Sequence, residues 1–191
     1  MKAQIRTFIA IELPERIRHG LVKVQQQLSR QVGTGLKVRW THVETMHLTL
    51  KFLGSIRRDV VPEVGDLMRE VAQDIDPFEI TIEGLGSFPS SDRPRILWVG
   101  VGGELEPLST LAKRLELGAR KLGAKGEDRR YVPHLTLGRV QSAPQDFAER
   151  LTSIKKPVLG TVQARELTLF MSELTRQGST YTALDRIAFG A

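Results

Sequence analysis

The order of apolar and polar positions along the chain predicts strands that alternate with amphipathic helices. Apolar residues recurring every three or four positions form one face of a helix, whereas short β-branched or strictly alternating runs indicate strands. We expect helices over residues 14–31, 59–75 and 105–122, and a short one near 145–151. Strands are expected over 5–13, 37–40, 46–54, 78–83, 95–101, 133–139, 158–172 and 180–189, the last two forming a hairpin through 176–178.

This order of elements does not repeat strand–helix–strand regularly, as a parallel sheet would require. It is typical of an α+β protein whose helices pack on mostly antiparallel sheets. No low-complexity linker divides the chain, so we treat residues 1–191 as one domain.

The sequence His-Leu-Thr-Leu occurs twice, beginning at His47 and at His134, each time in an apolar, β-prone run. Side chains in a strand alternate between two faces. We therefore expect His47 and Thr49 to share one face, and His134 and Thr136 to do the same. The opposite, core-facing side of the first copy would then carry Leu48, Leu50 and Phe52. The repeat suggests two similar lobes with the two motif strands side by side at their junction.

One such motif would be explained by ordinary exposed strand residues, but four identical residues in two matching contexts favour a site. Imidazole can donate or accept a proton near neutral pH, so one histidine can act as general acid and another as general base at a phosphorus centre. Threonine hydroxyls can hold the non-bridging phosphate oxygens. The other histidines are expected to be peripheral, His19 on a polar helix face and His42 in a loop.

Other chemistries have weaker support. Two histidines without a nearby carboxylate are few ligands for zinc, so we expect no metal and no cofactor. No Gly-x-Ser-x-Gly segment indicates a serine hydrolase, and the glycine-rich pieces match no phosphate-binding loop.

Composition narrows the class of protein further. Hydrophobic residues make up 40% and charged residues 26% of the 191, which is ordinary for a globular domain. No apolar run approaches the roughly 20 residues of a membrane helix, and the N-terminus lacks signal-peptide features. With no cysteine present, a cytoplasmic protein is the plain expectation. The net charge of +6, with several arginine pairs, suits a nucleic-acid partner.

The paired motifs resemble the 2H phosphoesterase superfamily, and in particular its bacterial and archaeal RNA 2',3'-cyclic phosphodiesterases, also called 2'-5' RNA ligases. The segments 6–11, 98–100 and 181–184 are also similar to that family, so the resemblance spans most of the chain. It implies a bilobed fold with two pseudo-symmetric sheets and outer helices around a central cleft. It also implies metal-independent hydrolysis of RNA 2',3'-cyclic phosphate ends to 2'-phosphomonoesters. The substrate itself is left open among tRNA halves, short oligonucleotides and a small cyclic phosphate such as an ADP-ribose derivative, and we expect a monomer.

The resemblance further implies the role of each residue. His47 would be the proton donor and His134 the proton acceptor, an order that the nearly symmetric motifs do not themselves determine. Thr49 and Thr136 would bind the phosphate.

Three further residues are candidates for substrate contact. Arg139 matches a family arginine, but strict alternation places it opposite His134 unless the strand ends or bulges there. Phe8 could stack on a base or belong to the core. Lys51 would share the His47 face and meet a phosphate, or be an ordinary surface lysine.

Two alternatives remain open. The same site could join RNA ends through a 2'-5' linkage, which is the hydrolysis reversed with a 5'-hydroxyl in place of water. A non-catalytic RNA-binding module would instead use only the basic cleft.

Overall fold

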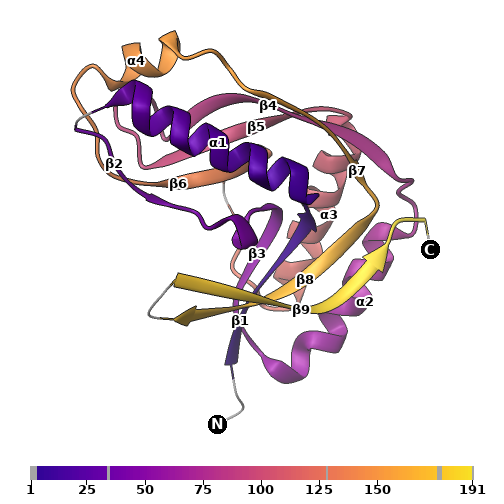
Figure 1. Cartoon of the computed structure of the whole chain (residues 1–191). Helices are drawn as coiled ribbons and strands as arrows, with labels where there is room; N and C mark the ends of the chain where they lie inside the picture. Colours follow the sequence, from indigo (N-terminus) through magenta and orange to yellow (C-terminus); the bar gives the residue numbers. More distant parts are fainter. Residues whose placement is uncertain (1–3, 34, 128, 176–177, 191) are drawn as a thin grey trace.

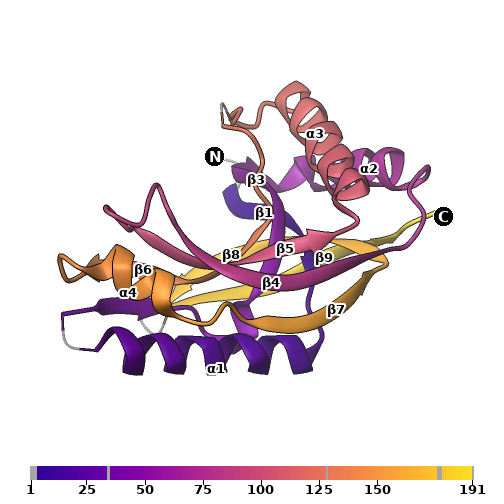
Figure 2. The ribbon, with the colours of Figure 1, turned by 90° about the horizontal axis from the view of Figure 1, so that it is seen from above.

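The computed structural model describes residues 4–33, 35–127, 129–175 and 178–190, and it confirms the expected α+β fold with two antiparallel sheets (Figures 1 and 2). The first sheet has the strand order β3 (His47–Arg57), β1 (Gln4–Glu12), β8 (Glu166–Thr175) and β9 (Gly178–Ala188). The second has the order β2 (Lys37–Trp40), β6 (His134–Ser142), β5 (Ile96–Gly103), β4 (Phe78–Phe88) and β7 (Val158–Ala164).

The helices cover the outer sides of the sheets, and two of them, α1 and α3, cover the sheet to which the preceding strand does not belong. They are α1 (Glu15–Val32), α2 (Val61–Ala72), α3 (Leu105–Lys121) and α4 (Phe147–Ser153), with short 3-10 turns at Val43–Thr45 and Arg58–Val60. Helix α1 follows β1 of the first sheet yet packs on β6 and β7 of the second. Helix α3 follows β5 of the second sheet yet packs on β3 of the first, beside α2. The two lobes are therefore interlocked.

The strand expected over 158–172 is in fact two strands, and this expectation was wrong. β7 ends at Ala164 in the second sheet, and β8 begins at Glu166 in the first. The apolar pattern runs on because both strands bury side chains, while Arg165 between them carries the chain from one sheet to the other. The β8–β9 hairpin is confirmed by its pairing, although residues 176–177 of its turn lie outside the described part of the chain.

A continuous buried core joins the two sheets to their helices. In the first sheet Ile9 and Leu48 are buried with Met68 of α2. In the second sheet Val99 and Leu135 belong to the same core. Each buried side chain of this size contributes about 1.5–3 kcal/mol. The shared core holds β3 and β6 next to each other where the two sheets meet.

Candidate active site

The two motif histidines begin β3 and β6, the strands that meet at the junction of the sheets. His47 Nδ1 lies 2.8 Å from the carbonyl oxygen of Thr45, and His134 Nδ1 lies 2.7 Å from that of Val132. A carbonyl oxygen only accepts hydrogen bonds, so Nδ1 carries the hydrogen in both rings. Nε2 is then the atom that gains or loses a proton. Both imidazoles are therefore oriented in the same way, by a hydrogen bond to the backbone carbonyl two residues earlier.

Aromatic side chains contact both imidazoles, with more of them around His47 than around His134. Phe8 stacks on His47 with ring centroids 4.5 Å apart, and Tyr181 meets the same ring edge-on at 5.3 Å. Burial lowers the pKa of His47 to about 4, against the opposing effect of the Thr45 carbonyl. Phe88 meets His134 edge-on at 4.9 Å, and burial lowers the pKa of His134 as well. At neutral pH the unliganded His47 is therefore uncharged.

Phe8 belongs to the wall behind His47. Its side chain is 2% exposed, and it also stacks on Phe170 at 5.2 Å. Of the two alternatives for Phe8, the structure bears out the core, because neighbouring protein side chains cover the ring and leave no free face for a base. Phe8 packs against the His47 ring and is part of the surroundings that bury it.

The two motif threonines are partly buried, and their hydroxyls form no hydrogen bond within the described part of the chain. The backbone carbonyl of Thr49 does have a partner, because the Tyr131 hydroxyl donates to it at 3.0 Å. Tyr131 stands three residues before His134, so this bond ties the approach to β6 directly to β3. No pattern in the sequence indicated that link.

Two irregularities in β3 overturn the expected facing of Lys51 and Phe52. Pairing with β1 skips Leu50 and Leu53, and each skipped residue reverses the alternation. Phe52 is consequently 53% exposed, with its ring 5.9 Å from Phe8 on the His47 side. Lys51 is 3% exposed instead, and it pairs with Glu116 of α3 at 2.7 Å. Lys51 is thus neither a phosphate ligand nor a surface lysine.

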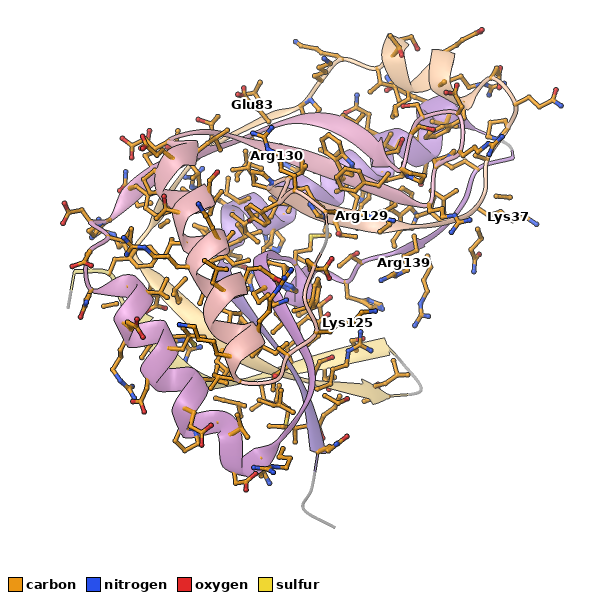
Figure 3. The ribbon with its side chains drawn as sticks, turned by 180° about the vertical axis from the view of Figure 1, so that it is seen from behind. Lys37, Glu83, Lys125, Arg129, Arg130 and Arg139 are labelled. Atoms are coloured by element: carbon orange, nitrogen blue, oxygen red, sulfur yellow. The ribbon has the colours of Figure 1, made fainter. Side chains whose placement is uncertain are left out.

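A similar irregularity in β6 places Arg139 on the same face as His134. Pairing with β5 skips Leu137, so the alternation reverses between Thr136 and Arg139. Gly138 allows the neighbouring strand to come this close, since a β-carbon there would lie 2.5 Å from Val38 Cγ1. The bulge that a site role for Arg139 requires is therefore present. Its side chain is exposed, as Figure 3 shows.

Arg6 and Tyr181 join this site from the first sheet. Arg6 lies two positions before Phe8 on β1 and is paired with Ser172, which in turn is paired with Tyr181. Burial raises the pKa of Tyr181, and the positive charges of Arg6 and Arg139 oppose that rise. Cations from both sheets thus lie near the same phenol beside His47. Period-two alternation over residues 6–8 was the signal that could have identified Arg6.

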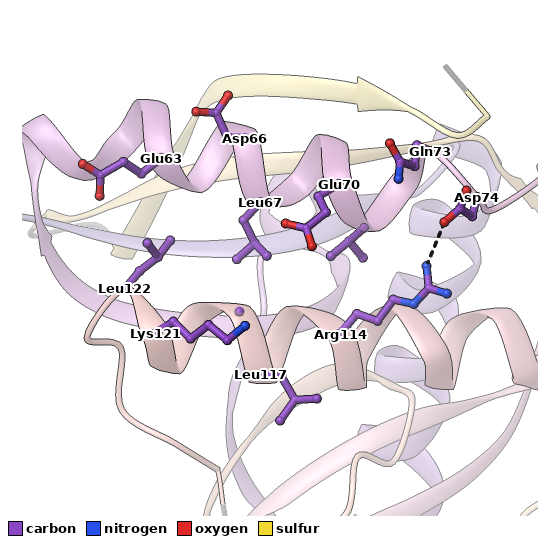
Figure 4. A pocket seen from close by; sticks show the side chains of 12 residues that line it. Glu63, Asp66, Leu67, Glu70, Gln73, Asp74, Arg114, Leu117, Lys121 and Leu122 are labelled. Atoms are coloured by element: carbon purple, nitrogen blue, oxygen red, sulfur yellow. Dashed lines mark ion pairs between the residues drawn. The ribbon is translucent and has the colours of Figure 1, made fainter.

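Other features of the described residues lie apart from this site. A hollow of about 570 Å³ lies between α2 and α3 and is lined by the Arg114–Asp74 ion pair, but none of the motif residues lines it (Figure 4). No group of three or more His, Cys, Asp or Glu side chains in the described ranges is placed to hold a metal ion. None of the described helices is long and apolar enough to cross a membrane.

Comparison with known proteins gives consistent matches over nearly the whole chain. It is 32% identical over 185 residues to the RNA 2',3'-cyclic phosphodiesterase of Methanothermobacter thermautotrophicus, covering 95% of this chain and 97% of that one. The enzyme of the same name from Archaeoglobus fulgidus is 31% identical over 180 residues, covering 94% and 98%.

Solved structures agree with the sequence matches. A protein of Thermus thermophilus superposes with a TM-score of 0.80 at 28% identity, covering 97% of this chain and 98% of that one. E. coli LigT complexed with 3'-AMP superposes with a TM-score of 0.78 at 26% identity, covering 99% and 100%. The family described as LigT like Phosphoesterase matches residues 11–98 and again 99–181. With one match over each copy of the histidine motif, the chain belongs to the LigT-like phosphoesterase family of the 2H superfamily.

Proposed function

We propose that this chain hydrolyses the 2',3'-cyclic phosphate at RNA 3' ends and leaves a 2'-phosphomonoester. The names of its relatives support this substrate. The observation that carries the proposal is the equivalence of the two histidines. Each has Nδ1 tied to the carbonyl two residues earlier and a threonine two residues later, on strands that meet.

In the proposed reaction His134 Nε2 takes a proton from water while the water oxygen forms a bond to phosphorus. The bond from phosphorus to O3' breaks, and His47 Nε2 gives its proton to O3', so the phosphate stays on O2'. Exchange with solvent then removes the proton from His134 and restores the one on His47. The assignment of His47 as the acid and His134 as the base is taken from the family resemblance.

The lowered pKa of His47 is compatible with its role as the acid. In the free protein, desolvation keeps this ring neutral, with its pKa at about 4. A phosphodiester carries a negative charge, and at about 4 Å, with an effective dielectric of about 20, it would stabilise imidazolium by about 4 kcal/mol. That energy corresponds to a pKa rise of about 3, which brings His47 close to neutral pH. Binding of the substrate would thus favour the protonated form of His47 that the reaction needs.

The two motif threonines would bind the phosphate group. The hydroxyls of Thr49 and Thr136, which have no partner in the described chain, would donate to its non-bridging oxygens. Arg139, farther along the same face of β6, would attract the negatively charged RNA towards the site rather than bind that phosphate. We propose RNA ends, tRNA halves among them, as the substrate class.

The test is hydrolysis of a short RNA ending in a 2',3'-cyclic phosphate, in excess EDTA, with separation of 2'- and 3'-phosphate products. We expect only the 2'-phosphate, and a loss of at least roughly 100-fold in kcat in His47→Ala and in His134→Ala. His19→Ala is the matched control, because that side chain is 60% exposed on α1.

Full activity in either motif variant would refute the two-histidine mechanism. The same RNA mixed with a 5'-hydroxyl oligonucleotide measures joining, which is the reverse reaction. We expect joining to be much slower than hydrolysis, because water is present in large excess over the 5'-hydroxyl group. Binding of RNA without turnover by the wild-type protein would instead favour the non-catalytic binding module.

A further inference from the structure

Three basic side chains, Lys37, Arg39 and Arg139, lie together at one edge of the second sheet without a carboxylate partner. β2 is one of the two edge strands of that sheet and pairs with β6. All three side chains are exposed, and none forms an ion pair within the described ranges. Six other described arginines do have such partners: Arg57, Arg69, Arg114, Arg120, Arg150 and Arg186 each pair with an Asp or Glu.

The register of β2 against β6 determines which way these three residues face. Arg39 is directly opposite Arg139, so the two share the face that also carries His134. Lys37 stands two residues before Arg39 and therefore faces the same way. Between them, Val38 packs against the hydrophobic core and so anchors the strand. Figure 3 shows Lys37 and Arg139 exposed in the same view.

Two like charges directly opposite each other on an antiparallel pair repel and destabilise it. An arrangement of this kind becomes favourable when an anion lies between or along the charges. The three residues also extend away from the active site in a definite order. Arg139 is five residues, or about 15 Å, along β6 from His134, and β2 lies about 4.8 Å farther out. Its charge nevertheless acts on Tyr181, next to His47.

We propose that Lys37 and Arg39, continuing from Arg139, bind the phosphodiesters upstream of the terminal nucleotide, so that single-stranded RNA leaves the active site across β2. This inference rests on the proposed function and refines its substrate class. A mononucleotide cyclic phosphate is too short to span the distance from His134 to β2. The preferred substrate is thus an RNA end with several unpaired nucleotides before the cyclic phosphate.

The test compares an RNA hexamer ending in a 2',3'-cyclic phosphate with adenosine 2',3'-cyclic monophosphate. At low salt, the double variant Lys37→Gln/Arg39→Gln should lower the ratio of kcat/KM for hexamer over mononucleotide about tenfold. The change should come from a higher KM for the hexamer. Each phosphate contact on a single strand contributes about 0.7 to the slope of log affinity against log salt. We therefore expect the slope for the hexamer to become shallower by about 1.4.

The matched control is Lys155→Gln/Lys156→Gln, which removes the same charge from an exposed loop before β7, at the opposite edge of the sheet. This control should leave the ratio of kcat/KM for hexamer over mononucleotide unchanged. The single variant Arg39→Lys, which keeps the positive charge, should retain most of the wild-type ratio.

Different failures have different meanings. An unchanged ratio in the β2 variant, with normal turnover of both substrates, would overturn this inference and leave the proposed function intact. Absence of turnover by the wild type would overturn the proposed function. In that case the affinity for a 5'-labelled hexamer, measured by fluorescence anisotropy, decides the inference. Equal affinity of the two double variants would refute it, and a weaker β2 variant would support it.

Discussion

Replacing Glu116 with Gln should destabilise this protein in a way that depends strongly on pH. Glu116, on α3, accepts from Lys51 at 2.7 Å, from Arg120 at 2.6 Å and from the backbone N–H of Glu127 at 2.9 Å. Lys51 in turn donates to the Lys125 carbonyl at 2.9 Å. This network connects the first motif strand to the loop that leads to the second.

The magnitude follows from the pKa of Glu116. Burial by itself raises that pKa, but the hydrogen bonds from Lys51, Glu127 and Arg120 and the charge of Lys51 hold it at about 2, against an ordinary 4.5. At 1.36 kcal/mol for each unit of pKa, the ionised carboxylate contributes about 3 kcal/mol at pH 7. Because the folded-state pKa is depressed, this stability is present above pH 4.5 and is lost as the pH falls towards 2. About 1.4 kcal/mol should remain at pH 3.

The assay is urea denaturation of the wild type and Glu116→Gln at pH 7 and pH 3, followed by tryptophan fluorescence. The difference in unfolding free energy between the two proteins should shrink by about half or more at pH 3. Asp66→Asn is the control, because Asp66 pairs with Arg69 on the surface with a side chain that is 75% exposed, where little effect is expected at either pH. An equal loss at both pH values, or no loss at pH 7, would show that the charge of Glu116 does not stabilise the fold.

Three further predictions test the site and the strand irregularities. An NMR titration should find the free-state pKa of His47 at about 4, and Phe8→Leu should move it towards 6.5 by admitting water; an unperturbed wild-type value would contradict the burial of the ring. Phe52→Ser should change the free energy of unfolding little, whereas Leu53→Ser should lower it by several kcal/mol, because only Leu53 is buried. Thermal unfolding of the two variants measures the difference, and similar losses of stability would refute the skipped pairings in β3. Gly138→Ala should lower stability by about 1–3 kcal/mol, since the added carbon would meet the Arg39 carbonyl oxygen at 2.9 Å; wild-type stability in urea would contradict that close approach.

Local patterns were sufficient for much of this protein. Three- and four-residue spacing placed α1 and α3 to within a residue or two, because a helix that packs on a sheet must present one apolar face. The repeated His-Leu-Thr-Leu was sufficient to choose four candidate site residues, because alternation in a strand depends only on neighbouring residues. The family resemblance drawn from these motifs was confirmed by the matches over both halves of the chain.

Alternation failed wherever a strand skipped a residue. The facing of Lys51, Phe52 and Arg139 depends on irregularities in β3 and β6, and these depend on which strand lies alongside. The sequence around Lys51 contains no sign of its partner Glu116, which is 65 positions away on a helix from the other half of the chain.

The sequence by itself determined the helices, most of the strands and the two motifs, because each of these follows from interactions between residues close together in the chain. Only the tertiary structure decided the exchange of α1 and α3 between the sheets, the change of sheet at Arg165 and the desolvation of His47. Each of these arises from contacts between segments far apart in sequence. Such contacts do not produce a recognisable hydrophobic periodicity in either of the segments that meet.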